Sequence, residues 1–289
     1  MFRWPTAFPL AFVAVAAGCA PLPKSASLLP TSPAADHVAL EVFFVHLAAD
    51  AATLTETLWS AVDEQAIDLD VRRRLASNGF LVGRVGGQPP AAVTELLQVS
   101  GDAPAPSVDE APVIVPTKAP LMHRKLIDVY QTETPNRVVV TGDRERHPKL
   151  VVLYRDETDG AVRGQTFKNA QGILLTKVLP QFDGRVKLDI VPEVEYGESR
   201  QQIEPGEGGA WTVQFAPPRK TFDGLRLSAM LLPGEMLIFG CRSDCPGSLG
   251  QQFFTDRQQD VQSQTIVLIR LVQAKSNDLF GNDPSNRQE

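Results

Sequence analysis

The sequence predicts an α+β protein in which a small α/β module precedes a mostly antiparallel β domain, built as a sandwich or a partly open sheet. In residues 38–98, apolar runs and helical spacings follow in the order strand, helix, helix, strand, helix. Residues 99–120 are dense in proline, and residues 121–273 consist of β-rich apolar runs separated by turn signals. Of the 289 residues, 43% are hydrophobic, which is enough for a core in one or two domains.

The α/β module opens with the run HVALEVFFVHL. This run is rich in β-branched and aromatic residues and is mostly apolar, which predicts a strand buried on both faces. Thr53 and Glu56 then have the spacing of a capping box. Leu54, Leu58 and Val62 fall four residues apart, so we expect a helix with one apolar face after the first strand.

The rest of the module follows from its turn residues. A second short helix is expected from Asp70 to about Ser77, because the turn pair Asn78-Gly79 ends it. The run FLVGRVGG predicts the next strand. Pro89-Pro90 can open a third helix, since proline fits the first helical turn.

The proline-rich residues 99–120 predict a linker, because little regular structure survives that density of proline. The β domain follows, with no long amphipathic helix except a short possible one at 167–172. A polar tail is expected at 274–289. Turn pairs such as Asp159-Gly160 and Pro233-Gly234 separate the expected strands, which are 121–131, 137–142, 149–156, 173–180, 185–197, 210–218, 224–242 and 264–273.

The first 18 residues, MFRWPTAFPLAFVAVAAG, have one cationic residue, a short apolar core and small residues at the end. This pattern is typical of a secretory signal peptide, and its apolar core is too short for a transmembrane helix. The small residues lead directly into Cys19. The arrangement resembles the bacterial lipobox, although Ala16 replaces the usual leucine three positions before the cysteine. Ordinary cleavage without a lipid, and an uncleaved anchor, are the alternatives.

The lipobox resemblance implies that Cys19 is lipid-modified and becomes the first residue of the mature chain. Several acyl chains would hold the protein on a membrane without any transmembrane helix. Residue 20 is alanine and not the aspartate that often signals inner-membrane retention, so the resemblance implies the outer membrane, facing the periplasm. Residues 19–37 would then be the lipidated cysteine and a flexible tether.

Two further cysteines, Cys241 and Cys245, stand in the short segment GCRSDCPG. In an oxidising compartment such a pair predicts a disulfide. Two cysteines without a nearby histidine make a poor zinc site, and a redox motif prefers a spacing of two residues. We therefore expect a structural disulfide and no metal ligands.

The charge pattern argues against nucleic-acid binding. The net charge is −6, and the one short basic tract is Arg72-Arg73-Arg74. Three adjacent helical residues point in different directions, so this tract is interpreted as a solvated helix face.

The search for a catalytic set yields one weak candidate. Asp143, Glu145 and His147 alternate and would share one face of a strand, as a conceivable acid–base or metal set. The segment GDRERHPK is dense in charge and contains a proline, which favours a solvated turn. His46 interrupts an apolar strand and is interpreted as a hydrogen-bonded core or edge histidine. No nucleophile with an identifiable base, no cofactor and no small-molecule substrate are expected.

The last third of the chain resembles bacterial secretins, the outer-membrane pores of type II and III secretion and of type IV pili. The matching phrases lie in Val186–Glu195, Leu225–Gly240, Leu249–Phe254 and Thr265–Leu271. The proline-glycine phrases that normally precede the third element are absent. No alternating strand pair is long enough to cross a bilayer.

Two functions are therefore expected. The favoured one is a non-enzymatic envelope lipoprotein, a structural or partner-binding component related to secretin-type secretion or pilus assemblies. It would bind the membrane through its lipid and pair with protein partners or with itself through exposed strand edges. The other is a periplasmic hydrolase whose residues come from distant strands.

Overall fold

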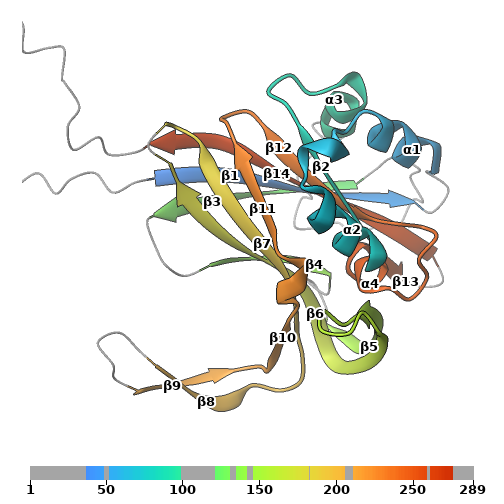
Figure 1. The fold of residues 1–289 in the computed structure, drawn as a ribbon, viewed down its shortest axis with the longest axis vertical. Helices are drawn as coiled ribbons and strands as arrows, with labels where there is room; N and C mark the ends of the chain where they lie inside the picture. The colour runs from blue at the N-terminus through green and yellow to red at the C-terminus, as the bar shows by residue number, and fades with distance from the viewer. Residues whose placement is uncertain are drawn as a thin grey trace, which may run out of the picture. The chain divides into compact units, whose positions relative to one another are not determined.

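Two antiparallel sheets and a separate hairpin make up the part of the chain that the computed structural model describes (Figure 1). These residues all belong to one unit, Ala34–Glu289. The described residues are 37–48, 52–98, 121–130, 135–141, 146–181, 183–205, 211–258 and 261–275. Residues 1–18, Cys19, most of the expected tether and linker, and residues 276–289 lie outside them.

The first sheet joins strands from both ends of the chain. Its centre is formed by β1 (His37–Ala48) and β14 (Val261–Lys275), which run antiparallel with His37 opposite Lys275. Adjacent residues of β1 are buried on opposite faces, so the prediction of a strand buried on both sides is confirmed. The other strands are β2 (Phe80–Val85), β12 (Met236–Cys241) and β3 (Leu121–Tyr130), in the order β2-β12-β14-β1-β3, while β13 (Thr255–Gln258) also pairs with β14.

This topology makes the α/β segment part of the same folded unit as the later strands. β1 and β2 do not pair with each other, because β12 and β14 lie between them. β14 and β12, which pair with β1 and β2 respectively, are more than 150 positions later in the sequence, and β1 also pairs with β3 on its other side. The sequence pattern suggested two domains divided by residues 99–120, and the structure joins them in one sheet.

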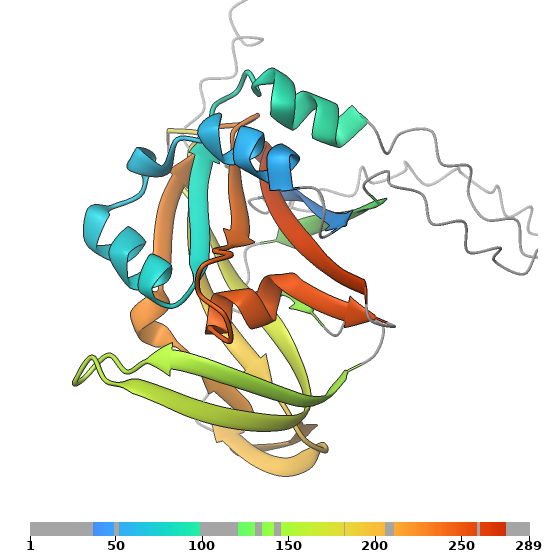
Figure 2. The ribbon, with the colours of Figure 1, turned by 90° about the vertical axis from the view of Figure 1, so that its right-hand side faces the viewer.

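The helices have the expected order around this sheet. Figure 2 shows α1 (Ala52–Ser60) and α3 (Ala91–Gln98) on one side of it, where Leu58, Val93 and Leu96 share a core with β1 and β14. Helix α1 begins at Ala52, so Thr53 lies inside the helix and does not cap it. The expected capping box is therefore wrong. α2 (Leu69–Ser77) is instead capped by Asp68, whose carboxylate accepts from the amides of Asp70 and Val71.

The second sheet packs against the opposite face of the first. Its core residues include Val138, Leu174 and Val194, which contact the same apolar cluster as Val42 and Leu237. The prediction of an α+β fold with mostly antiparallel sheets is thus confirmed. The strands of the second sheet are, in order, β10 (Arg219–Thr221), β7 (Val186–Glu195), β6 (Val162–Pro180) and β4 (Asn136–Thr141). In addition, β11 (Leu227–Leu231) pairs with β7 and β5 (His147–Arg155) pairs with β6.

Strand β6 is much longer than the sequence indicates. It extends over 19 residues, pairing with β5 through its first half and with β4 through its second. The short helix considered at 167–172 is therefore wrong. Asn169 has φ 48°, in the left-handed region, between the two halves. Pairing with β5 overrides the low strand propensity of its Gly, Asn and Gln residues.

A short helix missed by the sequence analysis, α4 (Leu249–Phe254), closes the core between the sheets. Phe253 and Phe254 contact Phe80 edge-on, with ring centroids 5.7 and 6.0 Å away. Ser248 caps this helix by accepting from the Gln251 amide.

A two-stranded hairpin stands apart from both sheets. It consists of β8 (Arg200–Pro205) and β9 (Trp211–Ala216), which pair with each other and with no other described strand (Figure 1). Among the described residues, no helix is both long and apolar enough to cross a membrane.

Candidate functional site

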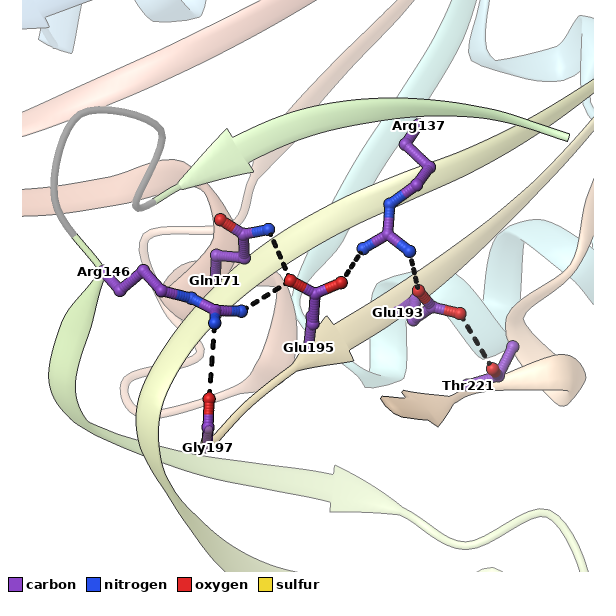
Figure 3. A network of polar contacts seen from close by, with 7 residues as sticks. All are labelled: Arg137, Arg146, Gln171, Glu193, Glu195, Gly197 and Thr221. Atoms are coloured by element: carbon purple, nitrogen blue, oxygen red, sulfur yellow. Dashed lines mark hydrogen bonds and ion pairs between the residues drawn. The ribbon is translucent and has the colours of Figure 1, made fainter. Parts of the chain in front are cut away.

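Two buried glutamates on β7 form the most concentrated polar cluster of the second sheet (Figure 3). Glu193 and Glu195 are 3% and 8% exposed. They are two positions apart, so they lie on one face, the face opposite Val194 and the shared core. The sequence analysis missed them, because they end a strand identified by its apolar residues.

At Pro192, the strand that neighbours β7 on one side changes. On one side, β7 pairs with β11 up to Ile190 and with β10 from Glu193 onward. Proline has no amide to donate, so it fits the position where the partner changes. Its carbonyl accepts from the Phe222 amide, 3.0 Å away.

Arginines from two other strands hold the carboxylates. Arg137 of β4 pairs with Glu195 Oε2 through Nη2, and its Nη1 lies 3.5 Å from Glu193 Oε1. Arg146, next to β5, donates to Glu195 Oε1 over 2.6 Å. Gln171 of β6 donates to the same oxygen over 3.0 Å.

Two more contacts complete the cluster. Thr221 of β10 donates to Glu193 Oε2 over 3.2 Å, and Arg146 Nη1 donates to the Gly197 carbonyl over 3.4 Å. Figure 3 shows these groups converging from different strands on the two carboxylates. The side chains therefore join β4, β6, β7 and β10 with Arg146, the residue before β5.

The charges in this cluster balance. Two carboxylates face two guanidiniums, and every carboxylate oxygen lies within an ion pair or hydrogen bond. Buried ion pairs with this geometry hold strands in register. Glu193 Oε1 is buried without a hydrogen-bond donor and has only the Arg137 guanidinium, 3.5 Å away, as a partner, while the other three carboxylate oxygens accept hydrogen bonds. Because these contacts join several strands, we call the cluster the carboxylate latch.

A third buried carboxylate lies in the first sheet. Glu41 of β1 is 1% exposed and pairs with Arg270 of β14 and Arg124 of β3. The Arg270 guanidinium also lies over the Phe43 ring, 5.5 Å from its centre. Glu41 stands between two cations, as Glu195 does, and links three strands.

The histidines have separate local partners. His46 lies on the central strand β1, and its Nδ1 shares a hydrogen bond of 3.0 Å with Thr265 Oγ1, in agreement with the expected hydrogen-bonded core or edge histidine. His147 Nε2 lies 2.6 Å from Thr141 Oγ1. Asp143 and Glu145 lie outside the described residues. In the described part of the chain, no group of three or more His, Cys, Asp or Glu residues could hold a metal ion.

The disulfide expected between Cys241 and Cys245 is not formed in this structure, where both cysteines are free. Cys241 ends β12 inside the core, and its Sγ accepts from Gln264 Nε2 over 3.6 Å. Burial raises the pKa of the Cys241 thiol to about 11. Cys245 is half-buried in the following loop, and its Sγ is directed toward Asp244 Oδ1, 3.6 Å away. The two thiols thus face different neighbours.

The arginine tract is divided between two roles. Arg74 Nε donates to the Gly224 carbonyl over 2.9 Å. Arg72 and Arg73 line an open pocket of about 570 Å³. Carboxylates also line this pocket, so its rim carries both signs of charge.

Comparison with known proteins gives little. No family model matches the chain, and no curated protein matches it. Among solved structures, the chain is similar to the InvG secretin domain β-barrel from the Salmonella SPI-1 injectisome needle-complex base, with 10% identity and a TM-score of 0.21. The match covers 83% of this chain and 61% of that one, less than two thirds of its length. A TM-score this low carries no structural or functional argument.

Proposed function

We propose that this chain is a non-enzymatic lipoprotein of the cell envelope that binds a protein partner in a secretin-type secretion or pilus assembly. Three features support the proposal. Residues 1–19 resemble a lipoprotein signal, the phrases from Val186 to Leu271 resemble those of secretins, and the β8–β9 hairpin offers an interaction surface.

The β8–β9 hairpin is the observation that carries partner binding. Phe215 is 75% exposed, and Val213, two positions earlier on the same face of β9, is 51% exposed. In the register, Val213 is opposite Ile203. A two-stranded hairpin is marginally stable alone in water, and exposed aromatic side chains are typical anchors of interfaces.

The edges of this hairpin suit strand addition. Among the described strands, β8 and β9 have no second neighbour, so each leaves one row of backbone donors and acceptors for a partner strand. We therefore assign the partner contact to strand pairing at this hairpin, with Phe215 as the side-chain anchor.

The polar clusters support a non-enzymatic role. Glu41, Glu193 and Glu195 are the buried carboxylates among the described residues, and arginines neutralise all three. Their contacts connect strands and present no acid–base pair to a pocket.

Site-specific photocrosslinking tests this proposal. A photoreactive phenylalanine analogue in place of Phe215 should crosslink, in the native membrane, to a component of a secretion or pilus assembly. The same analogue in place of Leu126, a residue of β3 that is 55% exposed, is the matched control. Crosslinks identical at both positions, or to no component of such an assembly, would contradict the assignment.

A further inference from the structure

The β5–β6 hairpin presents a second surface, its outer face. Alternation along each strand places eight residues on this face, and all eight are exposed. The opposite face packs into the shared core through Leu150, Val152 and Phe167. The eight outer residues form four cross-strand pairs, Lys149 with Lys168, Val151 with Thr166, Leu153 with Gly164 and Arg155 with Val162.

This outer face is cationic although the chain as a whole is acidic. It carries Lys149, Arg155 and Lys168 and no carboxylate, while the net charge of the chain is −6. In the described residues, no carboxylate oxygen lies within 4.0 Å of a side-chain nitrogen of these three cations. The surplus positive charge is therefore local to this face.

The carboxylates next to the face are already engaged. Asp156 accepts from Thr158 and pairs with Arg163 over 2.9 Å. Asp159 pairs with Arg163 as well, also over 2.9 Å. Glu157 accepts from the Gly224 amide. These contacts do not cancel the charge, because among the described residues Arg163 is the single cation that pairs with any of these three carboxylates. The unbalanced positive charge of the face is therefore concentrated at the pair Lys149 and Lys168, away from the turn.

The same face exposes three aliphatic side chains. Val151, Leu153 and Val162 are 45%, 43% and 59% exposed. Val151 and Leu153 lie between the lysine pair at one end and the pair Arg155 and Val162 at the turn end. These two ends are roughly 20 Å apart along the strand. Figure 2 shows the hairpin below the first sheet, with its turn extending to one side.

We propose that the outer face of the β5–β6 hairpin binds the surface of an anionic lipid bilayer. Interfacial protein elements combine cations, which attract anionic headgroups, with aliphatic side chains that enter the headgroup boundary. The cations and aliphatic side chains are spread over two strands, which suits the surface of a bilayer. At the turn end, Leu153, Arg155 and Val162 also line a small pocket beside Pro246 and Ser248. The inference extends the proposed function in one respect, since a lipid on Cys19 would keep this face close to a membrane.

Vesicle binding by the unlipidated chain tests the β5–β6 face separately from the lipid anchor on Cys19. The full chain with Cys19→Ser should sediment with vesicles of phosphatidylglycerol and phosphatidylcholine, and much less with vesicles of phosphatidylcholine alone. Binding should fall as salt is raised, because screening weakens the headgroup attraction. Residues common to all variants, including any apolar N-terminal segment, contribute equally to each comparison.

Two variants and one control identify the face. Each lysine removed should lower the partition coefficient about fivefold, so Lys149→Gln/Lys168→Gln should lower it roughly 25-fold. Val151→Ser/Val162→Ser should lower it further at high salt, where the apolar contribution remains. The control, Arg73→Gln/Lys125→Gln, removes the same charge from exposed positions elsewhere and should bind like the parent.

Three results would overturn the proposal. They are equal binding by the lysine variant and its control, equal binding to anionic and neutral vesicles, and binding to polyglutamate without binding to vesicles. The last would assign the face to an acidic protein. Release of the lipidated protein from membranes is a separate readout, so failure of the anchor and failure of this face are distinguishable.

Discussion

Gly250 of α4 lies directly against Gly79 of the turn before β2. A Cβ on Gly250 would come within 2.3 Å of the Gly79 carbonyl carbon, far inside contact distance. The Gly250 amide donates to the Asn78 carbonyl over 2.8 Å, and the Asn78 side chain also accepts from the Arg155 amide. This close approach joins α2, α4 and β5, and therefore the two sheets.

Gly250→Ala should destabilise the protein by about 1–3 kcal/mol, because the methyl group would push α4 away from the turn. Alanine is favoured over glycine inside a helix by about 1 kcal/mol, so a net loss would have to come from the contact and not from helix propensity. Urea denaturation measures the difference. Gly86→Ala, where an added Cβ meets nothing within 4 Å, is the control. Equal stability of the Gly250 variant and the parent would show that α4 does not pack as described.

The carboxylate latch gives a second prediction. Glu195→Gln leaves Arg137 and Arg146 without their shared anion, and removing one partner of a buried ion pair costs about 3 kcal/mol. The neighbouring exposed residue Glu198 provides the control Glu198→Gln, which should change stability little. A double-mutant cycle with Arg137→Gln should show coupling, measured as a free energy of unfolding that is not additive. Additive effects would show that Glu195 and Arg137 do not stabilise the second sheet through their contact.

Several elements were predictable from the sequence because their signals are local. The apolar runs of β1, β2 and β14 predict strands whatever their partners, and the pairs Asp159-Gly160 and Pro233-Gly234 predict turns. Gly160 and Gly234 have φ of 67° and 90°, a conformation that favours glycine. The pairing of β1 with β14 was not predictable, because it depends on contacts between the two ends of the described chain.

The candidate site was less predictable for the same reason. Glu41 interrupts a strand of apolar residues and Glu195 ends one, and nothing near either in the sequence identifies the arginines that balance their charge. Arg270 is 229 positions from Glu41, and Arg137 is 58 positions from Glu195. The cysteines show the opposite situation, in which a short spacing predicts a disulfide, while in this structure β12 carries Cys241 into the core and both thiols are free.

Acid pH should weaken the loop between Cys241 and Cys245. Arg242 donates to both oxygens of Asp244, over 2.9 and 2.6 Å, and these bonds lower the pKa of the Asp244 carboxyl from 3.8 to about 2. A carboxyl whose pKa is lowered in the folded state stabilises the protein at pH values above its ordinary pKa. This contribution is lost as the pH falls from about 4 to about 2. Asp244→Asn should therefore narrow the stability difference between pH 5 and pH 2, measured by thermal unfolding. A variant with the parent's pH dependence in this range would contradict the ion pair.

Thiol labelling tests the state of the two cysteines. In the reduced, folded protein, Cys245 should react with an alkylating reagent well before Cys241. Burial raises the pKa of the Cys241 thiol to about 11, so near pH 8 little of the reactive thiolate is present. Mass spectrometry of timed samples assigns each label. Cys245→Ser should remove the fast phase and leave the slow one. If neither thiol reacts in unreduced, denatured protein and both react after reduction, the expected disulfide forms in the native compartment.

Cys19→Ser tests the membrane anchor directly. Acyl chains contribute ~0.8 kcal/mol for each buried CH₂ group, and one chain holds a protein only marginally. Loss of all acyl chains should therefore move most of the protein from the membrane fraction to the soluble fraction, measured by immunoblotting after fractionation at high salt. High salt suppresses the electrostatic contact proposed for the β5–β6 hairpin, so the readout isolates the lipid. Metabolic labelling with a fatty-acid analogue should mark the parent and not the variant. Unchanged fractionation together with unchanged labelling would rule out lipidation at Cys19.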